Sequence, residues 1–288
     1  MNEITKSRKR KKARTIAKKV GLNIFFVALC FITLVPVIYC FGISFGAKNS
    51  LLSSDVNLLP KEWTIENYIT LFSDSDIGTW FLNTLILAVS SVVISLAVAI
   101  PSAYAFSRMR FLFRKTILNF LIILNAFPAV LSMFAIYRLI TNMGLNNTKF
   151  GLIIIYSGTM SIFCVWNLKG YFDTIPYEIE EAAEMDGASS FQIISRIVMP
   201  LAKPALSVTA VMVLIYVWNE YIFSTTFLTG SENFTLAAGL YSLQASETTG
   251  SWPVFFAASL VVSIPILVVF MSAQKNMVSG LSAGGVKE

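Results

Sequence analysis

Long apolar runs recur along this chain and constrain its fold more than any other feature. Each is about 20 residues long, enough for an α-helix to cross roughly 30 Å of hydrocarbon. We predict spans over residues 22–44, 80–106, 117–140, 150–168, 206–227 and 254–272. The alternating pattern typical of membrane β-barrels is absent from the sequence. The chain is therefore predicted to be an all-α integral membrane protein with six transmembrane helices.

The composition supports this prediction and narrows the chemistry. Of 288 residues, 56% are hydrophobic and 13% are charged, and the mean hydropathy is +0.70, which excludes an ordinary soluble domain. Cys30, Cys40 and Cys164 lie within predicted spans and are interpreted as small hydrophobic residues. The sequence has no His and no G-x-x-x-x-G-K-[ST] motif. We therefore expect no catalytic residue, metal site or cofactor in this chain.

Basic residues are distributed unevenly and predict an orientation. Nine Lys or Arg lie within residues 6–19, immediately before the first span, which indicates a topology signal rather than a nucleic-acid site. With the N-terminus in the cytoplasm, 18 of the 22 Lys and Arg fall in cytoplasmic segments. We predict a basic cytoplasmic segment (1–21), a six-helix membrane domain (22–272) and a cytoplasmic tail (273–288), so both termini are cytoplasmic.

A polar segment, residues 174–203, separates the fourth and fifth spans and is typical of two short helices. Pro176 suits a first helical position, and the acids after it oppose the positive end of the helix dipole. Gly187 can adopt the left-handed conformation that ends a helix, and Ser189 begins a capping-box pattern. Pro200 is expected to break the second helix. The segment is predicted to be a helix-turn-helix outside the bilayer.

The same segment fits a longer pattern: E-A-A, three residues, G, nine residues, I, one residue, L-P. The matching residues are Glu181, Ala182, Ala183, Gly187, Ile197 and Pro200, with Met199 replacing the leucine. The pattern resembles the cytoplasmic coupling loop of permease subunits of binding-protein-dependent ABC importers. That resemblance implies the type I ABC importer permease fold and a loop that binds an ATPase subunit. Asp186 shares the helix face of the two alanines and is included among the coupling residues.

Other stretches extend the resemblance over about residues 22–288. They are N-T-L at 83–85, P-S-A-Y-A-F-S-R at 101–108, F-P-A-V-L-S at 127–132 and K-G-Y-F at 169–172. The last residues are similar to the ending of the second, shorter permease of maltose/maltodextrin importers, which in that family reaches into the ATPase dimer. The resemblance implies ATPase contacts at Gly280, Leu281, Gly284 and Lys287. Composition alone predicts a frayed tail there.

Polar and aromatic side chains in the spans are candidates for the substrate path, because buried polar groups in a membrane are often functional. The candidates are Asn125, Trp218, Asn219 and Glu220. An aromatic face can cover the C–H surface of a sugar while amides and carboxylates bind its hydroxyls. An alternative stays open: Glu220 meets water near the outer end of its span, and Asn side chains bridge helices.

The resemblance thus implies the membrane subunit of an ATP-driven importer of a sugar, with maltose/maltodextrin or a related oligosaccharide expected. The implied partners are a second permease subunit in a heterodimer, a dimer of ATPase subunits that binds ATP and Mg, and an extracytoplasmic sugar-binding protein; no nucleic acid is expected. Another oligosaccharide or a polyol phosphate is the alternative substrate. A secondary transporter is disfavoured, because the spans offer one candidate carboxylate and no inverted repeat.

Overall fold

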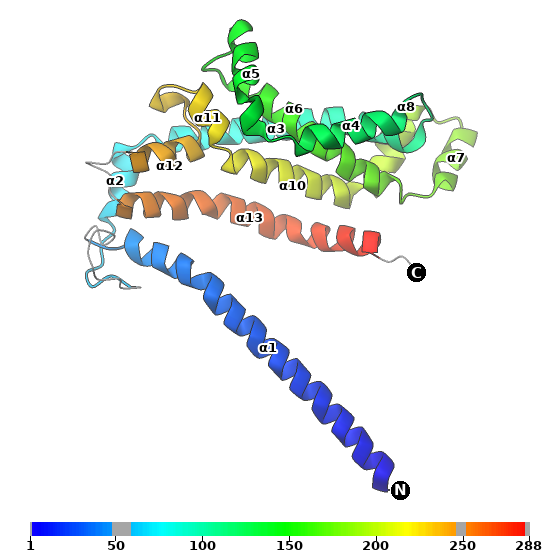
Figure 1. Cartoon of the computed structure of the whole chain (residues 1–288), viewed down its shortest axis with the longest axis horizontal. Helices are drawn as coiled ribbons and strands as arrows, with labels where there is room; N and C mark the ends of the chain where they lie inside the picture. Colours follow the sequence, from blue (N-terminus) through cyan, green and yellow to red (C-terminus); the bar gives the residue numbers. More distant parts are fainter. Residues whose placement is uncertain (1, 48–58, 246–251, 286–288) are drawn as a thin grey trace. The chain divides into compact units, whose positions relative to one another are not determined.

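The computed structural model describes residues 2–47, 59–245 and 252–285 (Figure 1). These residues are almost entirely helical and lack β-strands beyond one isolated bridge, between Gly46 and Trp63. The chain divides into two units, Met1–Leu71 with Thr249–Leu260, and Phe72–Thr248 with Val261–Glu288. Each unit is described by itself.

The smaller unit is dominated by helix α1 (Asn2–Ser44). The predicted first span lies inside it, and the side chains of its apolar half are largely exposed, as expected of a helix that faces lipid or another subunit. After α1 the chain folds back toward the start of α2 (Glu66–Asp74). The Asn67 side-chain amide donates to the carbonyl oxygens of Ser44 and Gly46, at 2.9 and 3.0 Å. Asn67 therefore fastens α2 to the segment that follows α1.

The larger unit contains most of the helices. Their bounds are α3 (Ile77–Arg108), α4 (Arg114–Ala126), α5 (Ala129–Asn142), α6 (Lys149–Phe172), α7 (Tyr177–Met185), α8 (Ser190–Ile193), the π turn η2 (Ile194–Val198), α9 (Met199–Leu201), α10 (Lys203–Asn219), α11 (Ile222–Phe227), the 3₁₀ turn η3 (Ser231–Asn233) and α12 (Leu236–Ala245). The last helix, α13 (Trp252–Gly285), begins in the smaller unit and ends in this one.

Helices α3, α6 and α10 form the core of the larger unit, with the most extensive packing between α3 and α6. On α3, small residues recur every four positions and are fully buried: Ser91, Ser95, Ala99 and Ala103. Such a stripe allows two helix backbones to approach closely, which is the main source of packing energy inside a membrane. With 32 residues, α3 is about 48 Å long, so its two ends extend beyond the hydrocarbon of a bilayer.

Two of the predicted spans are interrupted, and the prediction of single helices there was wrong. The span at 117–140 consists of α4 and α5, which meet at 100° across Phe127 and Pro128, because proline lacks the N–H that would continue the helix. The span at 206–227 ends at Asn219, where Glu220 takes an extended backbone conformation (ψ 118°). Four described helices can cross a membrane by length and composition, or six if each of two bent pairs counts as one span; those pairs are α4 with α5, and the helical segment Ser190–Leu201 with α10.

The polar segment between α6 and α10 starts where predicted and departs from prediction at one proline. Helix α7 begins at Tyr177, with Pro176 as its N-cap, as expected of a helix that starts near Pro176. Pro200 does not end the second helix, because helical structure continues to Leu201 through the π turn η2. A proline ring clashes with the carbonyl four residues earlier, and the wider π turn accommodates it. The bend comes after Leu201, where α10 leaves at 81°.

The end of the chain is more helical than its composition predicts. Helix α13 continues to Gly285, so Gly280, Leu281 and Gly284 have helical backbone instead of a frayed one. Lys287 lies outside the described residues.

Candidate functional site

The α7–α8 hairpin, residues 177–193, has the turn that the sequence predicts. Gly187 adopts φ +81°, and its N–H donates to the Glu184 carbonyl at 2.9 Å. The Ala188 N–H donates to the Ala183 carbonyl at 3.0 Å, which completes a Schellman motif. Ser189 then caps α8 in a capping box with Gln192. These local bonds fix the sharp turn at the extremity of the larger unit (Figure 1).

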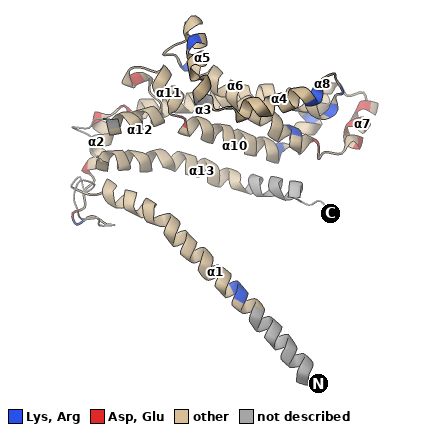
Figure 2. Cartoon of the chain, in the orientation of Figure 1, with Lys and Arg blue, Asp and Glu red and all other residues tan. Residues whose placement is uncertain are grey.

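The hairpin presents a mixed apolar and acidic surface. Met185 and Phe191 are 88% and 77% exposed, among the most exposed large hydrophobic residues described. The predicted coupling residues Glu181, Ala182, Asp186, Gly187 and Pro200 are also exposed, whereas Ala183 and Ile197 are half-buried. Figure 2 shows the acidic residues gathered on α7. Exposed apolar side chains rimmed by charge are typical of a surface that binds another protein.

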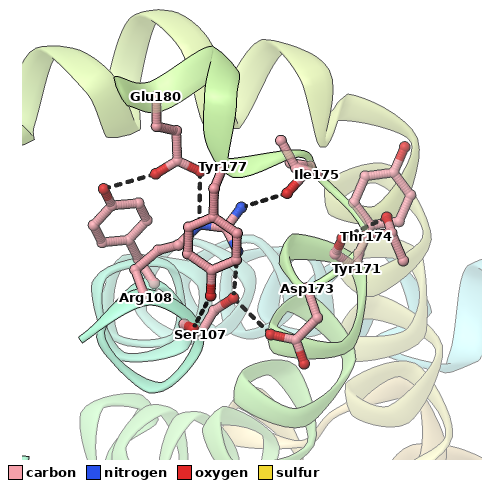
Figure 3. A network of polar contacts seen from close by, with 9 residues as sticks. Ser107, Arg108, Tyr171, Asp173, Thr174, Ile175, Tyr177 and Glu180 are labelled. Carbon is pink, nitrogen blue, oxygen red and sulfur yellow. Dashed lines mark hydrogen bonds and ion pairs between the residues drawn. The ribbon is translucent and has the colours of Figure 1, made fainter. Parts of the chain in front are cut away.

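Glu180 behaves differently from the other acids of α7, because its side chain points back into the bundle (Figure 3). It is 5% exposed, and its Oε1 accepts a hydrogen bond from Arg108 Nε at 2.7 Å. The two side chains are 7% and 6% exposed, so this is a buried ion pair. Its second oxygen accepts from the Tyr104 hydroxyl at 2.9 Å. Both partners come from the last turns of α3.

The Arg108 guanidinium joins three segments of the chain. Besides Glu180, it donates to the Ile175 carbonyl at 2.9 Å and to the Ser107 hydroxyl at 3.0 Å. Its Cζ atom lies 4.2 Å from the centroid of the Tyr177 ring, a cation–π contact. The Tyr177 hydroxyl in turn donates to the Ser107 carbonyl at 3.1 Å. This network holds the first turn of α7 and the loop before it against the end of α3.

Sequence reasoning missed Arg108 and Glu180 as site residues. The pair is separated by 72 positions, so no local pattern reveals it. Two signals were nevertheless present: an arginine at the end of the second span, and two adjacent acids before the alanines, which lie on different faces of the helix. Glu181 takes the outward position.

The second candidate, Glu220, lies near the opposite end of the larger unit, between α10 and α11. It is 9% exposed, and both carboxylate oxygens are engaged. Oε1 accepts from the Phe223 N–H at 2.8 Å, and Oε2 accepts from the Ser224 N–H at 3.2 Å and from the Tyr156 hydroxyl at 2.6 Å. Among the described residues no Lys or Arg forms an ion pair with it. Glu220 therefore caps α11 and ties it to α6.

Glu220 also lines a pocket of about 430 Å³ between α5, α10 and α11. The lining is mostly apolar and includes Met133, Tyr216, Asn219 and Tyr221. Trp218 is not part of it: its ring packs edge-on against Phe81, and its indole N–H donates to the Val262 carbonyl at 3.2 Å. Asn125 is exposed near the end of α4 and is not among the lining residues. The structure thus brings together two of the four predicted path residues.

The first turns of α3 are hydrogen-bonded to the segment that follows α11. Asn83 donates from its side-chain amide to the carbonyls of Glu232 and Phe234, both at 2.9 Å, and the Trp80 indole N–H donates to the Ser231 carbonyl at 2.9 Å. Asn83 is 2% exposed. Its polar group is therefore satisfied by the backbone of η3 and of the residue after it, instead of by another membrane helix.

Comparison with known proteins agrees with this architecture. Residues 93–282 match the family described as binding-protein-dependent transport system inner membrane component. Over 269 residues, 93% of this chain and 94% of the relative, the chain is 38% identical to the inner membrane ABC transporter permease protein YcjP of Escherichia coli (strain K12). It is 33% identical over 270 residues to the maltodextrin transport system permease protein MdxG of Bacillus subtilis (strain 168), covering 93% and 96%.

Among solved structures, a similar chain occurs in the crystal structure of a bacterial ABC transporter involved in the import of the acidic polysaccharide alginate. The TM-score is 0.77 at 29% identity, covering 92% of this chain and 96% of that chain.

The helical bundle, its small-residue packing and the projecting hairpin define a membrane-spanning permease of the type I ABC importer fold. The chain belongs to the family of binding-protein-dependent transport system inner membrane components. The predicted resemblance to carbohydrate ABC importer permeases is confirmed, as is the prediction that the chain is a transport subunit and not an enzyme.

Proposed function

We propose that this chain is the permease subunit of an ATP-driven oligosaccharide importer, and that the α7–α8 hairpin couples it to an ATPase subunit. The supporting observation is the hairpin itself: its turn is fixed by backbone bonds, and exposed Met185 and Phe191 lie beside exposed acids. A partner protein can bind such a surface without a change in the fold of the hairpin. The predicted coupling residues Glu181, Ala182, Asp186 and Gly187 lie on its exposed part.

The proposal includes the remaining partners and the orientation. A second permease would complete a heterodimer, a dimer of ATPase subunits would bind ATP and Mg, and an extracytoplasmic sugar-binding protein would deliver the substrate. The hairpin and both termini would be cytoplasmic, in agreement with the positive-inside distribution. The end of α13, with Gly280, Leu281 and Gly284, would reach toward the ATPase dimer, and Lys287, outside the described residues, is included in this proposed contact.

Maltodextrin is the expected substrate, and the pocket beside Asn219 and Glu220 is the proposed part of this subunit's substrate path. One similar protein belongs to a maltodextrin transport system and a similar structure belongs to a transporter involved in alginate import. Because these sugars differ, the substrate of this chain needs a direct assay. Binding-protein-dependent ATP hydrolysis by the reconstituted transporter would be measured with maltodextrins, galactooligosaccharides, alginate oligosaccharides and a polyol phosphate in turn. We expect maltodextrins to stimulate ATP hydrolysis. If only another of these compounds stimulates it, that compound and not maltodextrin is the substrate.

Two matched glycines test the coupling role. Gly187 and Gly144 both have positive φ (+81° and +69°), and neither Cβ position has an atom within 4 Å. Proline cannot adopt either conformation, so each Gly→Pro variant damages one turn. Gly187→Pro in the reconstituted complex should abolish sugar-stimulated hydrolysis or release the ATPase subunits. Gly144→Pro, in the loop between α5 and α6, should retain both. Normal stimulation in Gly187→Pro would show that the hairpin is not the coupling element.

Cysteine labelling tests the orientation. In a variant without the natural cysteines, single cysteines at Asp74 and Glu232 should react with a membrane-impermeant reagent in intact cells, and one at Ser190 should react only after permeabilisation. All three native side chains are exposed. Labelling of Ser190→Cys from outside would invert the proposed topology.

A further inference from the structure

The attachment of α7 to the bundle has an unusual construction. Apart from its neighbour α8, α7 makes few close approaches to other elements, and most of its side chains are exposed. The main exceptions are Glu180, which is buried in the network of Figure 3, and half-buried Ala183. A helix with so little packed area depends on directional contacts for its position.

We propose that Arg108 and Glu180 are positioning residues that make α7 and the end of α3 move as one body, so that motion of the hairpin reaches the membrane helices through α3. This inference rests on the proposed coupling function and names the joint through which it acts. The hairpin is also joined by chain to α6 and, through α8 and α9, to α10. The ion pair adds a connection to α3, which is distant in sequence.

The geometry of Arg108 supports a rigid joint instead of a simple charge pair. Its fork donates to Glu180, to the Ile175 backbone and to Ser107, so it fixes α7, the loop before it and α3 together. The Ser107 hydroxyl in turn donates to Asp173 Oδ1 at 2.6 Å, and Asp173 is the C-cap of α6. Lysine carries the same charge as a single point without the planar fork and cannot reproduce these three directions.

The burial of the joint favours transmission over independent movement. Separating Arg108 from Glu180 would leave two charges out of water without partners, which is strongly unfavourable. The Tyr177 ring covers one face of the guanidinium, and Tyr104 holds the second carboxylate oxygen. A displacement of α7 therefore carries the end of α3 with it more readily than it opens the network. Since α3 and α6 share the core, the displacement continues into the bundle.

The test compares transport with hydrolysis in the reconstituted full complex. We expect Arg108→Gln and Glu180→Gln to keep their ATPase subunits and basal hydrolysis, while sugar transported per ATP falls about tenfold or more, because a displacement of α7 no longer carries the end of α3 with it. Arg108→Lys should stay impaired despite its charge. Matched controls are Arg110→Gln and Glu178→Gln, both exposed near the network, which should transport normally.

A milder variant keeps the inference testable if the first two fold poorly. Tyr104→Phe removes one hydrogen bond to Glu180 and leaves the ion pair, so it should lower transport per ATP to a smaller extent than Arg108→Gln. If Arg108→Gln or Glu180→Gln transports as much sugar per ATP as the controls, the proposal that this pair links α7 to α3 is wrong. That result would leave the proposed function intact, because ATPase docking is tested separately by the Gly187→Pro and Gly144→Pro pair.

Discussion

The described part of the larger unit holds two buried glutamates, Glu180 in the first turn of α7 and Glu220 at the break between α10 and α11, and they are stabilised in opposite ways. Glu180 pairs with a cation from another helix, 72 residues away. Glu220 accepts two N–H groups from its own segment and one hydroxyl from α6, with no cation in an ion pair among the described residues. The first arrangement joins two distant elements, whereas the second mainly shapes one turn and one pocket.

This difference explains why only one of them is suited to transmit motion. A long-range ion pair makes the position of one helix depend on another, and its loss leaves a buried charge behind. A local cap fixes where a helix starts, and its loss is felt chiefly within that turn. We therefore assign coupling to the Glu180 network and pocket shape to Glu220.

The largest expected effect comes from breaking the ion pair. Glu180→Ala and Arg108→Ala should each lower the free energy of unfolding of the solubilised complex by about 3–5 kcal/mol, because each leaves its partner buried and unpaired. The double variant should lose less than the sum of the two. Glu178→Ala, an exposed acid on the same helix, should change it by less than about 0.5 kcal/mol. Additive losses would mean that the two residues act independently.

Two tyrosines sharpen the comparison, because each donates to one of the glutamates. Tyr156→Phe removes one of three donors to Glu220 and should cost about 1.5–3 kcal/mol, the range for a hydrogen bond to a charged group. Tyr104→Phe should cost less, since Arg108 still compensates Glu180. The denaturant midpoints of the two variants, measured in the same detergent, compare these losses of stability. A larger loss in Tyr104→Phe than in Tyr156→Phe would contradict the view that Glu180 is stabilised mainly by Arg108.

The smallest effect concerns the shape of the hairpin, separate from its attachment. Gly187→Ala and Gly170→Ala both place a methyl group in open space, but only Gly187 has positive φ. The first should lose about 1–2 kcal/mol of local stability. The second, inside α6, should lose none, because alanine is the better helix former. Hydrogen exchange of the backbone amides of α7 and α8 would report the difference, and equal exchange in both variants would argue against strain at Gly187.

Local signals in the sequence predicted the hairpin well. Gly187 and the Ser189–Gln192 capping box act within a few residues of themselves, so their conformations can be read from sequence. The apolar runs likewise predicted the four helices long and apolar enough to span a membrane, since span length depends on bilayer thickness. The turn at Pro200 was predicted less well, because a π turn is a tertiary adjustment that composition does not reveal.

The features that sequence reasoning missed depend on distant contacts. Glu220 accepts from Tyr156, 64 positions away, and Glu180 pairs with Arg108, 72 positions away, and neither pairing leaves a periodic pattern. Trp218 illustrates the same limit: hydrophobic periodicity places it on a helix but does not say that its ring meets Phe81 instead of the pocket. Only packing decides which face of a helix meets which neighbour.

The most direct measurement of the central claim is photo-crosslinking from the tip of α7. A photoreactive phenylalanine analogue at Met185, which is 88% exposed, should yield an adduct between this chain and the ATPase subunit in a transporter that hydrolyses ATP in response to sugar. The same analogue at Glu232, an exposed residue near the opposite end of α3, should yield none with that subunit. An ATPase adduct from Glu232, or its absence from Met185 in an active complex, would contradict the account.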